Sequence, residues 1–276
     1  MQPAFGTLFD AHIGTVFARQ LLFSKYLGPQ NQPKLDLEKG TADFGAGRVF
    51  AIQLLGTQLD AEDAWLWAWA EQNETPFPPA LLLDSQELKA KGVAEHIDTL
   101  EHPKLVLELS SVPLVPDEFN GDHIASVAAG IFNTAYWREP LDNGLLFYLV
   151  KDLPAELTGP YEVPYILETI EQVASYYSTD NEAMVEYFLK QQGFSVQWQD
   201  VQEDKTEDSE EGVTLLAHRG AEEITARFDA EYVLQEIEAH GFEGEENYQE
   251  QEDQEAQDWW DAEDPDQEFP PPLGTA

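Results

Sequence analysis

Tryptophans stand at every second position of the segment 65–69, separated by a leucine and an alanine. In a strand, alternate side chains point to the same face, so Trp65, Trp67 and Trp69 would form a row of three indoles. Such a row lines a ligand groove or anchors a protein partner. It also suits a core between sheet and helix, and this is the favoured interpretation because large aromatic residues are usually buried.

A second aromatic feature lies near the C-terminus, where Trp259 and Trp260 stand among acids and precede Phe269. Acids and aromatic rings in a disordered segment can dock together in a basic, apolar groove. A solubilising tail is the favoured interpretation. The candidate binding residues of the whole chain are Trp65, Trp67, Trp69, Trp137, Trp259 and Trp260.

Catalytic and metal-binding patterns give no support for an enzyme. There is no cysteine, no G-x-S-x-G turn and no H-E-x-x-H pair, and the histidines are scattered. Asp43-Phe44-Gly45 matches a kinase triplet by letters, but the other kinase motifs are missing. Asp117, Glu118 and Asp122 form an acidic cluster, where Asp122 is more simply a helix cap. We therefore predict a protein that is not an enzyme and has no cofactor, catalytic residue or metal ligand.

Charge is the strongest compositional signal. The chain of 276 residues holds 54 acids and 14 bases, a formal net charge of −40. Residues 1–50 hold four acids and five bases, residues 51–242 hold 37 and nine, and residues 243–276 hold 13 acids and no base. Nucleic-acid binding is disfavoured because it requires clustered Lys and Arg. A basic protein partner would be attracted, although net charge also serves solubility alone.

The first half of the sequence predicts one α+β unit. Apolar residues at helical spacing from Phe5 to Leu21 predict a helix that stops at Gly28. Strands are predicted over 35–37, 49–57, 64–70, 105–109 and 145–150, with turns at 60–63 and 142–144. Further helices are predicted over 79–91, ending at Gly92, over 93–100, and after a cap at Asp122.

The second half predicts a smaller unit after a linker at 153–164. Helices are predicted over 166–177 and 182–192, the latter capped by Asp180, and strands over 194–198, 213–218 and 224–228. Residues 200–212 read as a loop, and 232–239 as a strand or a helix. The fold class is α+β, with two helix-plus-antiparallel-sheet units at 1–152 and 160–242 and a disordered acidic tail at 243–276.

Two short motifs carry a resemblance to a known family. One is Trp65-Leu66-Trp67-Ala68-Trp69-Ala70 after Leu55-Gly56-Thr57, and the other is Ala135-Tyr136-Trp137-Arg138 before Asp142-Asn143-Gly144. Together they resemble an uncharacterised bacterial family, a domain of unknown function marked by a tryptophan-rich W-x-W-A-W strand, over about residues 5–150. The resemblance implies a bacterial, cytoplasmic protein and no particular catalytic residues.

These observations favour a non-enzymatic acidic binding protein. Its sharpest form is an immunity protein whose carboxylates neutralise the cationic cleft of a basic bacterial toxin. The alternative is an enzyme or small-molecule binder with a cleft lined by Trp65, Trp67 and Trp69. No signal peptide and no apolar stretch of membrane-spanning length is apparent, so we expect a cytoplasmic protein without membrane partners.

Overall fold

The fold combines helices with antiparallel sheets, which confirms the α+β class. The structure is a computed structural model that describes residues 3–28, 32–71, 73, 77–107, 119–200 and 212–245. Its first half contains α1 (Pro3–Leu27), β1 (Lys34–Asp36), β2 (Thr41–Asp43), β3 (Val49–Leu59), β4 (Ala64–Trp67), α2 (Leu83–Glu95), α3 (Asp98–Glu101), β5 (Lys104–Val106), α4 (Gly121–Ile131), β6 (Ala135–Leu141) and β7 (Gly144–Val150). Its second half contains α5 (Val163–Tyr176), α6 (Asn181–Gln191), β8 (Ser195–Asp200), β9 (Val213–Arg219), β10 (Glu222–Phe228) and β11 (Leu234–His240). Short 3-10 turns occupy Asp60–Glu62, Pro79–Leu81 and Ala155–Leu157.

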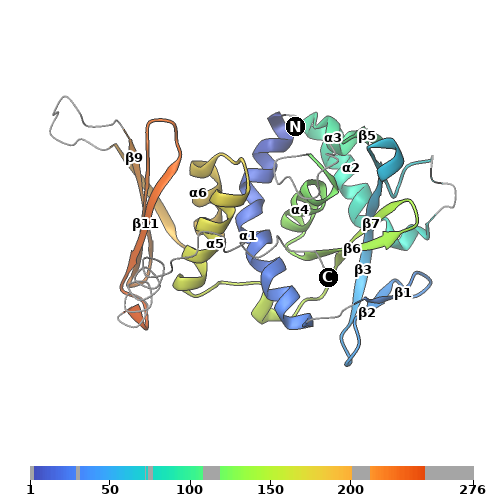
Figure 1. Ribbon diagram of the computed structural model, residues 1–276, viewed down its shortest axis with the longest axis horizontal. Coiled ribbons are helices and arrows are strands. Elements are labelled where there is room, and N and C mark those ends of the chain that lie inside the picture. Colours follow the sequence, from blue (N-terminus) through green and yellow to red (C-terminus); the bar gives the residue numbers. More distant parts are fainter. Residues whose placement is uncertain are drawn as a thin grey trace, which may run out of the picture.

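The elements stack in layers on the two sides of α1 (Figure 1). On one side α5 and α6 pack on α1 and are covered in turn by the four-stranded sheet β11-β10-β9-β8. On the other side α4 packs between α1 and the seven-stranded sheet. The long first helix is therefore the element that joins the two sheets.

The seven-stranded sheet is organised around β3, whose length allows it to pair with β2, β4 and β7. The predicted hairpin across 60–63 is present, although β4 ends at Trp67. Strand β6 was not predicted as a strand, and it forms a hairpin with β7 across Asn143. Its Pro140 is accommodated near the end of the strand, next to the turn.

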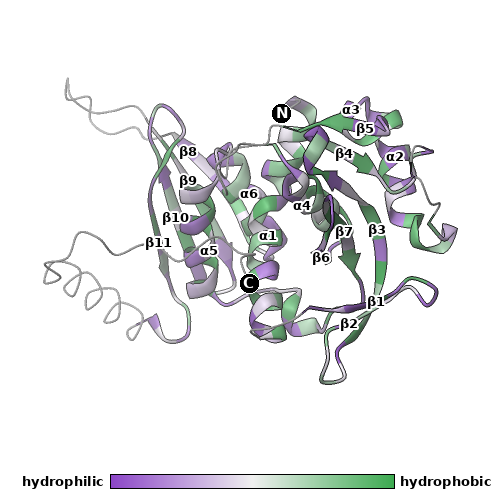
Figure 2. Ribbon diagram, turned by 45° about the vertical axis from the view of Figure 1, so that its right-hand side comes forward, coloured by the Kyte–Doolittle hydropathy of each residue, from purple (hydrophilic) through white to green (hydrophobic). Residues whose placement is uncertain are grey.

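Helix α1 is apolar on more than one side because it is packed from several directions. Phe5, Phe9 and Ile13 are buried in the core cluster that it shares with α4, α5 and α6. Figure 2 shows that hydrophobic residues concentrate on α1, α4 and the adjoining strands. Arg19 is also fully buried at 0 % exposure, where its guanidinium donates to the carbonyl oxygen of Thr134 at 2.9 Å and to the side chain of Asn133.

The structure corrects two predicted helix boundaries. Helix α2 continues through Gly92 to Glu95, and its C-cap residue His96 has a left-handed φ of 57°. The glycine is required for close packing, because a Cβ there would lie 2.7 Å from Cβ of Leu100. Helix α4 is capped by Asn120, whose side chain accepts from the backbone N–H of Asp122 and His123, so Asp122 is not the cap.

The second half follows its predicted order. Asp180 caps α6 by accepting from the backbone N–H of Ala183 at 3.0 Å, as predicted, and β11 settles the open choice at 232–239 as a strand. One core cluster runs from α1 through α5 and α6 into the small sheet. The division into domains at 1–152 and 160–242 stays a prediction, and the tail beyond Glu245 and most of the 200–212 loop lie outside the described residues.

Candidate binding groove

The predicted tryptophan row lies largely inside the protein. Trp65 and Trp67 are both 0 % exposed, and Trp69 is partly buried beyond the end of β4. The ring of Trp67 contacts that of Trp65 edge-on at 5.5 Å between centroids and stacks on that of Trp69 at 6.2 Å. The indole N–H of Trp67 donates to the carbonyl oxygen of Thr99 at 3.1 Å. These contacts are those of a core, the interpretation that the sequence favoured.

Of the other predicted binding residues, the structure describes Trp137, which lies in a different cluster from this row. Trp137 is partly buried on β6 and packs edge-on against Phe44, 5.1 Å between ring centroids. Trp259 and Trp260 lie outside the described residues, as do Asp117 and Glu118. Among the described residues, the structure therefore does not assemble the candidate tryptophans into one surface.

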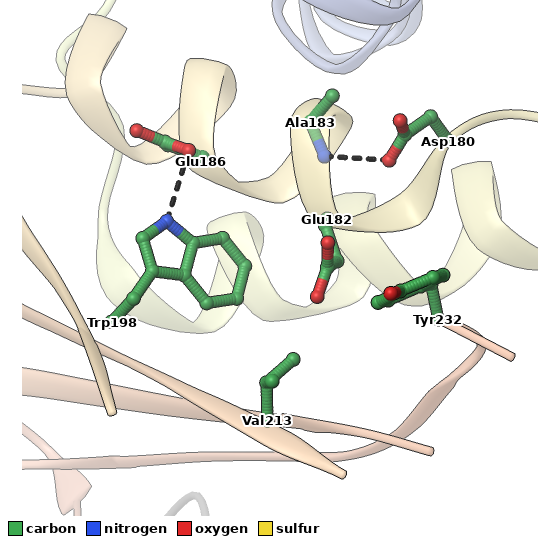
Figure 3. A pocket seen from close by; sticks show the side chains of 7 residues that line it. All are labelled: Asp180, Glu182, Ala183, Glu186, Trp198, Val213 and Tyr232. Atoms are coloured by element: carbon green, nitrogen blue, oxygen red, sulfur yellow. Dashed lines mark hydrogen bonds between the residues drawn. The ribbon is translucent and has the colours of Figure 1, made fainter. Parts of the chain in front are cut away.

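A surface groove of about 410 Å³ opens between α6 and the small sheet. Figure 3 shows α6 above it and the strands below, with Trp198 at one end, Tyr232 at the other, and Val213 on the sheet side. Three carboxylates of Asp180, Glu182 and Glu186 come from the helix side. We call this feature the acidic groove and define it by Asp180, Glu182, Ala183, Glu186, Trp198, Val213 and Tyr232.

Strand alternation positions Trp198 at one end of the acidic groove. On β8, Val196 and Trp198 share the face that is turned toward α6, since the strand side chains alternate. The indole N–H of Trp198 donates to a carboxylate oxygen of Glu186 at 3.0 Å, and its ring lies 5.7 Å from that of Phe228. The side chain nevertheless remains 39 % exposed, because β8 is the edge strand of its sheet among the described strands.

A turn between β10 and β11 positions Tyr232 at the other end. Tyr232 has a left-handed φ of 65°, and its backbone N–H donates to the carbonyl oxygen of Asp229 at 3.0 Å. Positive φ is uncommon for a residue with a large side chain, and this backbone turn is held by Asp229, whose carboxylate accepts from the N–H groups of Glu231 and Val233. The residue is 57 % exposed, among the most exposed large hydrophobic side chains described.

The three carboxylates of the acidic groove have different surroundings. Asp180 is engaged as the cap of α6, and Glu186 accepts from Lys190 and Trp198. Burial alone would raise the pKa of Glu186, but the hydrogen bonds from Lys190 and Trp198 bring it below its ordinary value. Partial burial, followed by the charges of Asp180 and Glu186, raises the pKa of Glu182. Glu182 is thus the carboxylate that a cation would stabilise most.

The groove also connects to α1 through a fourth acid. A side-chain oxygen of Asp10 accepts from the backbone N–H of Asp180 at 3.4 Å. Burial raises the pKa of Asp10 from 3.8 to about 6, against the opposing effect of that hydrogen bond. The start of α6 is thereby tied to α1 through an acid whose ionised form is disfavoured by burial.

A second polar cluster lies at the start of α4 and is closed on itself. Asp122 accepts from the guanidinium of Arg138 at 2.7 Å and from the hydroxyl of Tyr136 at 3.1 Å. Burial raises the pKa of the neighbouring Tyr177 to about 12, so that hydroxyl stays protonated at neutral pH. Because the acid and the base neutralise each other, this cluster is better explained as a tie between α4 and β6.

Sequence reasoning missed the acidic groove, although its parts were visible. Trp198 was read only as one residue of an alternating strand, and Tyr232 as the start of an ambiguous segment. The available signal was Trp198, which stands between two glutamines on a predicted strand. The helix predicted just before that strand has acids, Glu182 and Glu186, in its first half. Only the fold shows that Tyr232, distant in sequence, closes the other end.

No group of three or more histidine or acidic side chains is arranged to hold a metal ion within the described residues. Within the same part of the chain, no helix combines the length and apolarity needed to cross a bilayer.

Comparison with known proteins identifies a family through the first half of the chain. A model described as "Family of unknown function (DUF6882)" matches residues 6–153, which include the buried tryptophan row. No curated protein and no solved structure matches the chain. The acidic groove lies outside the matched segment.

Proposed function

The chain belongs to the DUF6882 family, whose function is unknown. We infer that it is a non-enzymatic protein that binds a basic protein partner. The observation that carries this proposal is the acidic groove, an exposed pair of aromatic side chains bordered by carboxylates in a chain of net charge −40. Aromatic side chains supply buried area in protein interfaces, while complementary charge supplies orientation and fast association.

The charge balance around the groove supports a cationic partner. Residues 154–200 and 212–245 hold sixteen acids and three bases. All three bases are already paired with acids of the same unit, Lys190 with Glu186, Arg219 with Glu222, and Arg227 with Glu236. The remaining carboxylates repel one another, and a basic surface would relieve that repulsion on binding.

The narrower form of the proposal is an immunity protein. Its acidic surface would cover the cationic cleft of a bacterial toxin, and the partner would lose activity on binding. The competing idea of a cleft lined by Trp65, Trp67 and Trp69 has no specific observation in its favour, since two of these indoles are fully buried.

The test is affinity capture from a lysate of the native source, followed by kinetics with each captured protein. The proposal predicts a basic partner whose association rate falls at least about tenfold between low salt and about 0.5 M salt, because screening removes electrostatic steering. An association rate that does not change with salt, or an acidic partner, would contradict it. The immunity form adds that stoichiometric binding abolishes the activity of the partner.

A further inference from the structure

We propose that the acidic groove receives one arginine side chain of a basic segment, flanked by Trp198 and Tyr232 and paired with Glu182. This inference rests on the proposed function, because it specifies which part of the chain meets the partner and by what chemistry. The groove, of about 410 Å³, falls within the range of small-ligand pockets, so a guanidinium and its aliphatic stem fit with adjoining atoms.

Two exposed aromatic side chains in one groove are the first support for a partner. Trp198 is 39 % exposed and Tyr232 is 57 % exposed, and both line the same hollow. Figure 3 shows them on opposite sides of Glu182, whose carboxylate points from α6 toward the strands. Aromatic faces attract cations, and more strongly once water is excluded.

Of the three groove carboxylates, Glu182 is the one whose side chain still lacks a partner among the described residues. Asp180 accepts from the start of α6, and Glu186 is already matched by Lys190. Within the part of the chain that the structure describes, the side chain of Glu182 makes no ion pair or hydrogen bond. A single positive group could therefore form an ion pair with Glu182 without displacing an existing pair.

Arginine suits this arrangement better than lysine. Its guanidinium is planar, so it stacks on an aromatic face while its N–H groups donate to a carboxylate, and it is less strongly hydrated than an ammonium group. The pKa of Glu182 is raised first by burial and then by neighbouring acids. An apolar side chain in the groove would bury this carboxylate further and would not neutralise its charge. The geometry thus favours a flat cation.

The experiment uses the full chain and a short peptide, blocked at both ends, in which arginine alternates with glycine. Matched peptides replace arginine by lysine or by citrulline, which has nearly the same shape and no charge. Isothermal titration should show binding of the arginine peptide about tenfold or more tighter than the citrulline peptide, with lysine between them. Equal binding of arginine and citrulline peptides, or no binding of either, would overturn the proposal.

Variants place the effect in the groove. Glu182→Gln should lower the affinity for the arginine peptide about tenfold, since it removes a charge-assisted hydrogen bond. Trp198→Leu should lower that affinity several-fold, since it removes the aromatic face. Glu38→Gln is the matched control, because it removes the same charge from an exposed turn between β1 and β2 and should leave affinity unchanged. Equal losses from Glu182→Gln and Glu38→Gln would show general charge attraction and overturn the groove assignment.

The arginine site can be wrong while the proposed binding function is correct, and the variants distinguish the two results. If the captured partner binds with salt-sensitive kinetics while Glu182→Gln and Trp198→Leu leave its affinity intact, the acidic binding protein stands and the arginine site is wrong. Circular dichroism verifies that each variant is folded. If Trp198→Leu does not fold, the isosteric Glu182→Gln decides the question alone.

Discussion

The two aromatic regions of this molecule each place tryptophan on a strand, but their environments are opposite. The row on β4 alternates tryptophan with small or apolar residues and is buried, with Trp65 and Trp67 at 0 % exposure. Trp198 also lies on a strand, but its neighbours Gln197 and Gln199 are polar and its side chain is 39 % exposed. Tyr232 joins it from a turn.

The difference comes from the position of each strand in its sheet. Strand β4 pairs on both edges, with β3 and β5, and its four residues are all buried. Strand β8 is an edge strand that pairs with β9, and α6 covers it only in part. Aromatic alternation predicts a strand with one apolar face, whereas the neighbouring elements decide whether that face is core or surface.

The largest effect should come from truncating the buried row. We expect Trp67→Ala to lower the free energy of unfolding by about 3–5 kcal/mol, because it creates a cavity and removes the donor to the carbonyl of Thr99. Urea denaturation followed by circular dichroism measures this change. A loss below about 1 kcal/mol would mean that Trp67 is not a core residue.

A nearly comparable loss should follow replacement of Arg19, the buried cation of α1. Arg19→Met leaves the carbonyl of Thr134 and the side chain of Asn133 without their donor, so we expect a loss of about 2–4 kcal/mol in the same assay. Arg227→Met is the control, because its ion pair with Glu236 is exposed and is worth less than about 1 kcal/mol. Equal losses would contradict the burial difference.

Burial of Asp10 near the groove predicts that removing its charge increases the free energy of unfolding instead of lowering it. The folded pKa of Asp10 is about 6 against an ordinary 3.8, so the folded state binds its proton more tightly than the unfolded state. The stability that this gives is complete below pH 3.8 and is lost as the pH rises through about 6.

Asp10→Asn should therefore be more stable than the parent chain at neutral pH, by about 1 kcal/mol after allowance for solvent screening. The gain should vanish near pH 4, where both side chains are neutral. Thermal unfolding of both proteins across this pH range measures the difference. Asp10→Asn being less stable at neutral pH would show that the hydrogen bond to Asp180, not the charge, dominates.

The smallest effect on stability should come from the exposed tryptophan. Trp198→Ala should lower the free energy of unfolding by about 1 kcal/mol. The native side chain is only partly buried, and the substitution removes one hydrogen bond, that to Glu186. Denaturation beside Trp67→Ala gives the comparison directly. A loss of about 3 kcal/mol or more would place Trp198 in the core and remove the contrast between the two regions.

Local patterns predicted most elements because each depends on neighbouring residues. The opening helix, the hairpin across 60–63 and the Asp180 cap follow from periodicity, turn composition and capping chemistry. Tertiary packing decided the rest. Gly92 does not end α2 but allows its close contact with Leu100. Asp122 pairs with Arg138, and Asn120 caps α4. The groove was inaccessible to sequence reasoning because α6, β8 and the turn at Tyr232 meet only in the fold.

We expect the exposed aromatic region, and not the buried one, to meet a cationic partner. The most direct measurement is a titration of the ¹⁵N-labelled chain with the arginine peptide, following the indole N–H resonances of its seven tryptophans. Single Trp→Phe variants assign the signals of Trp65, Trp67 and Trp198. We predict that the Trp198 resonance shifts in a saturable way while those of Trp65 and Trp67 do not move. An unmoved Trp198 resonance at saturating peptide would contradict the account.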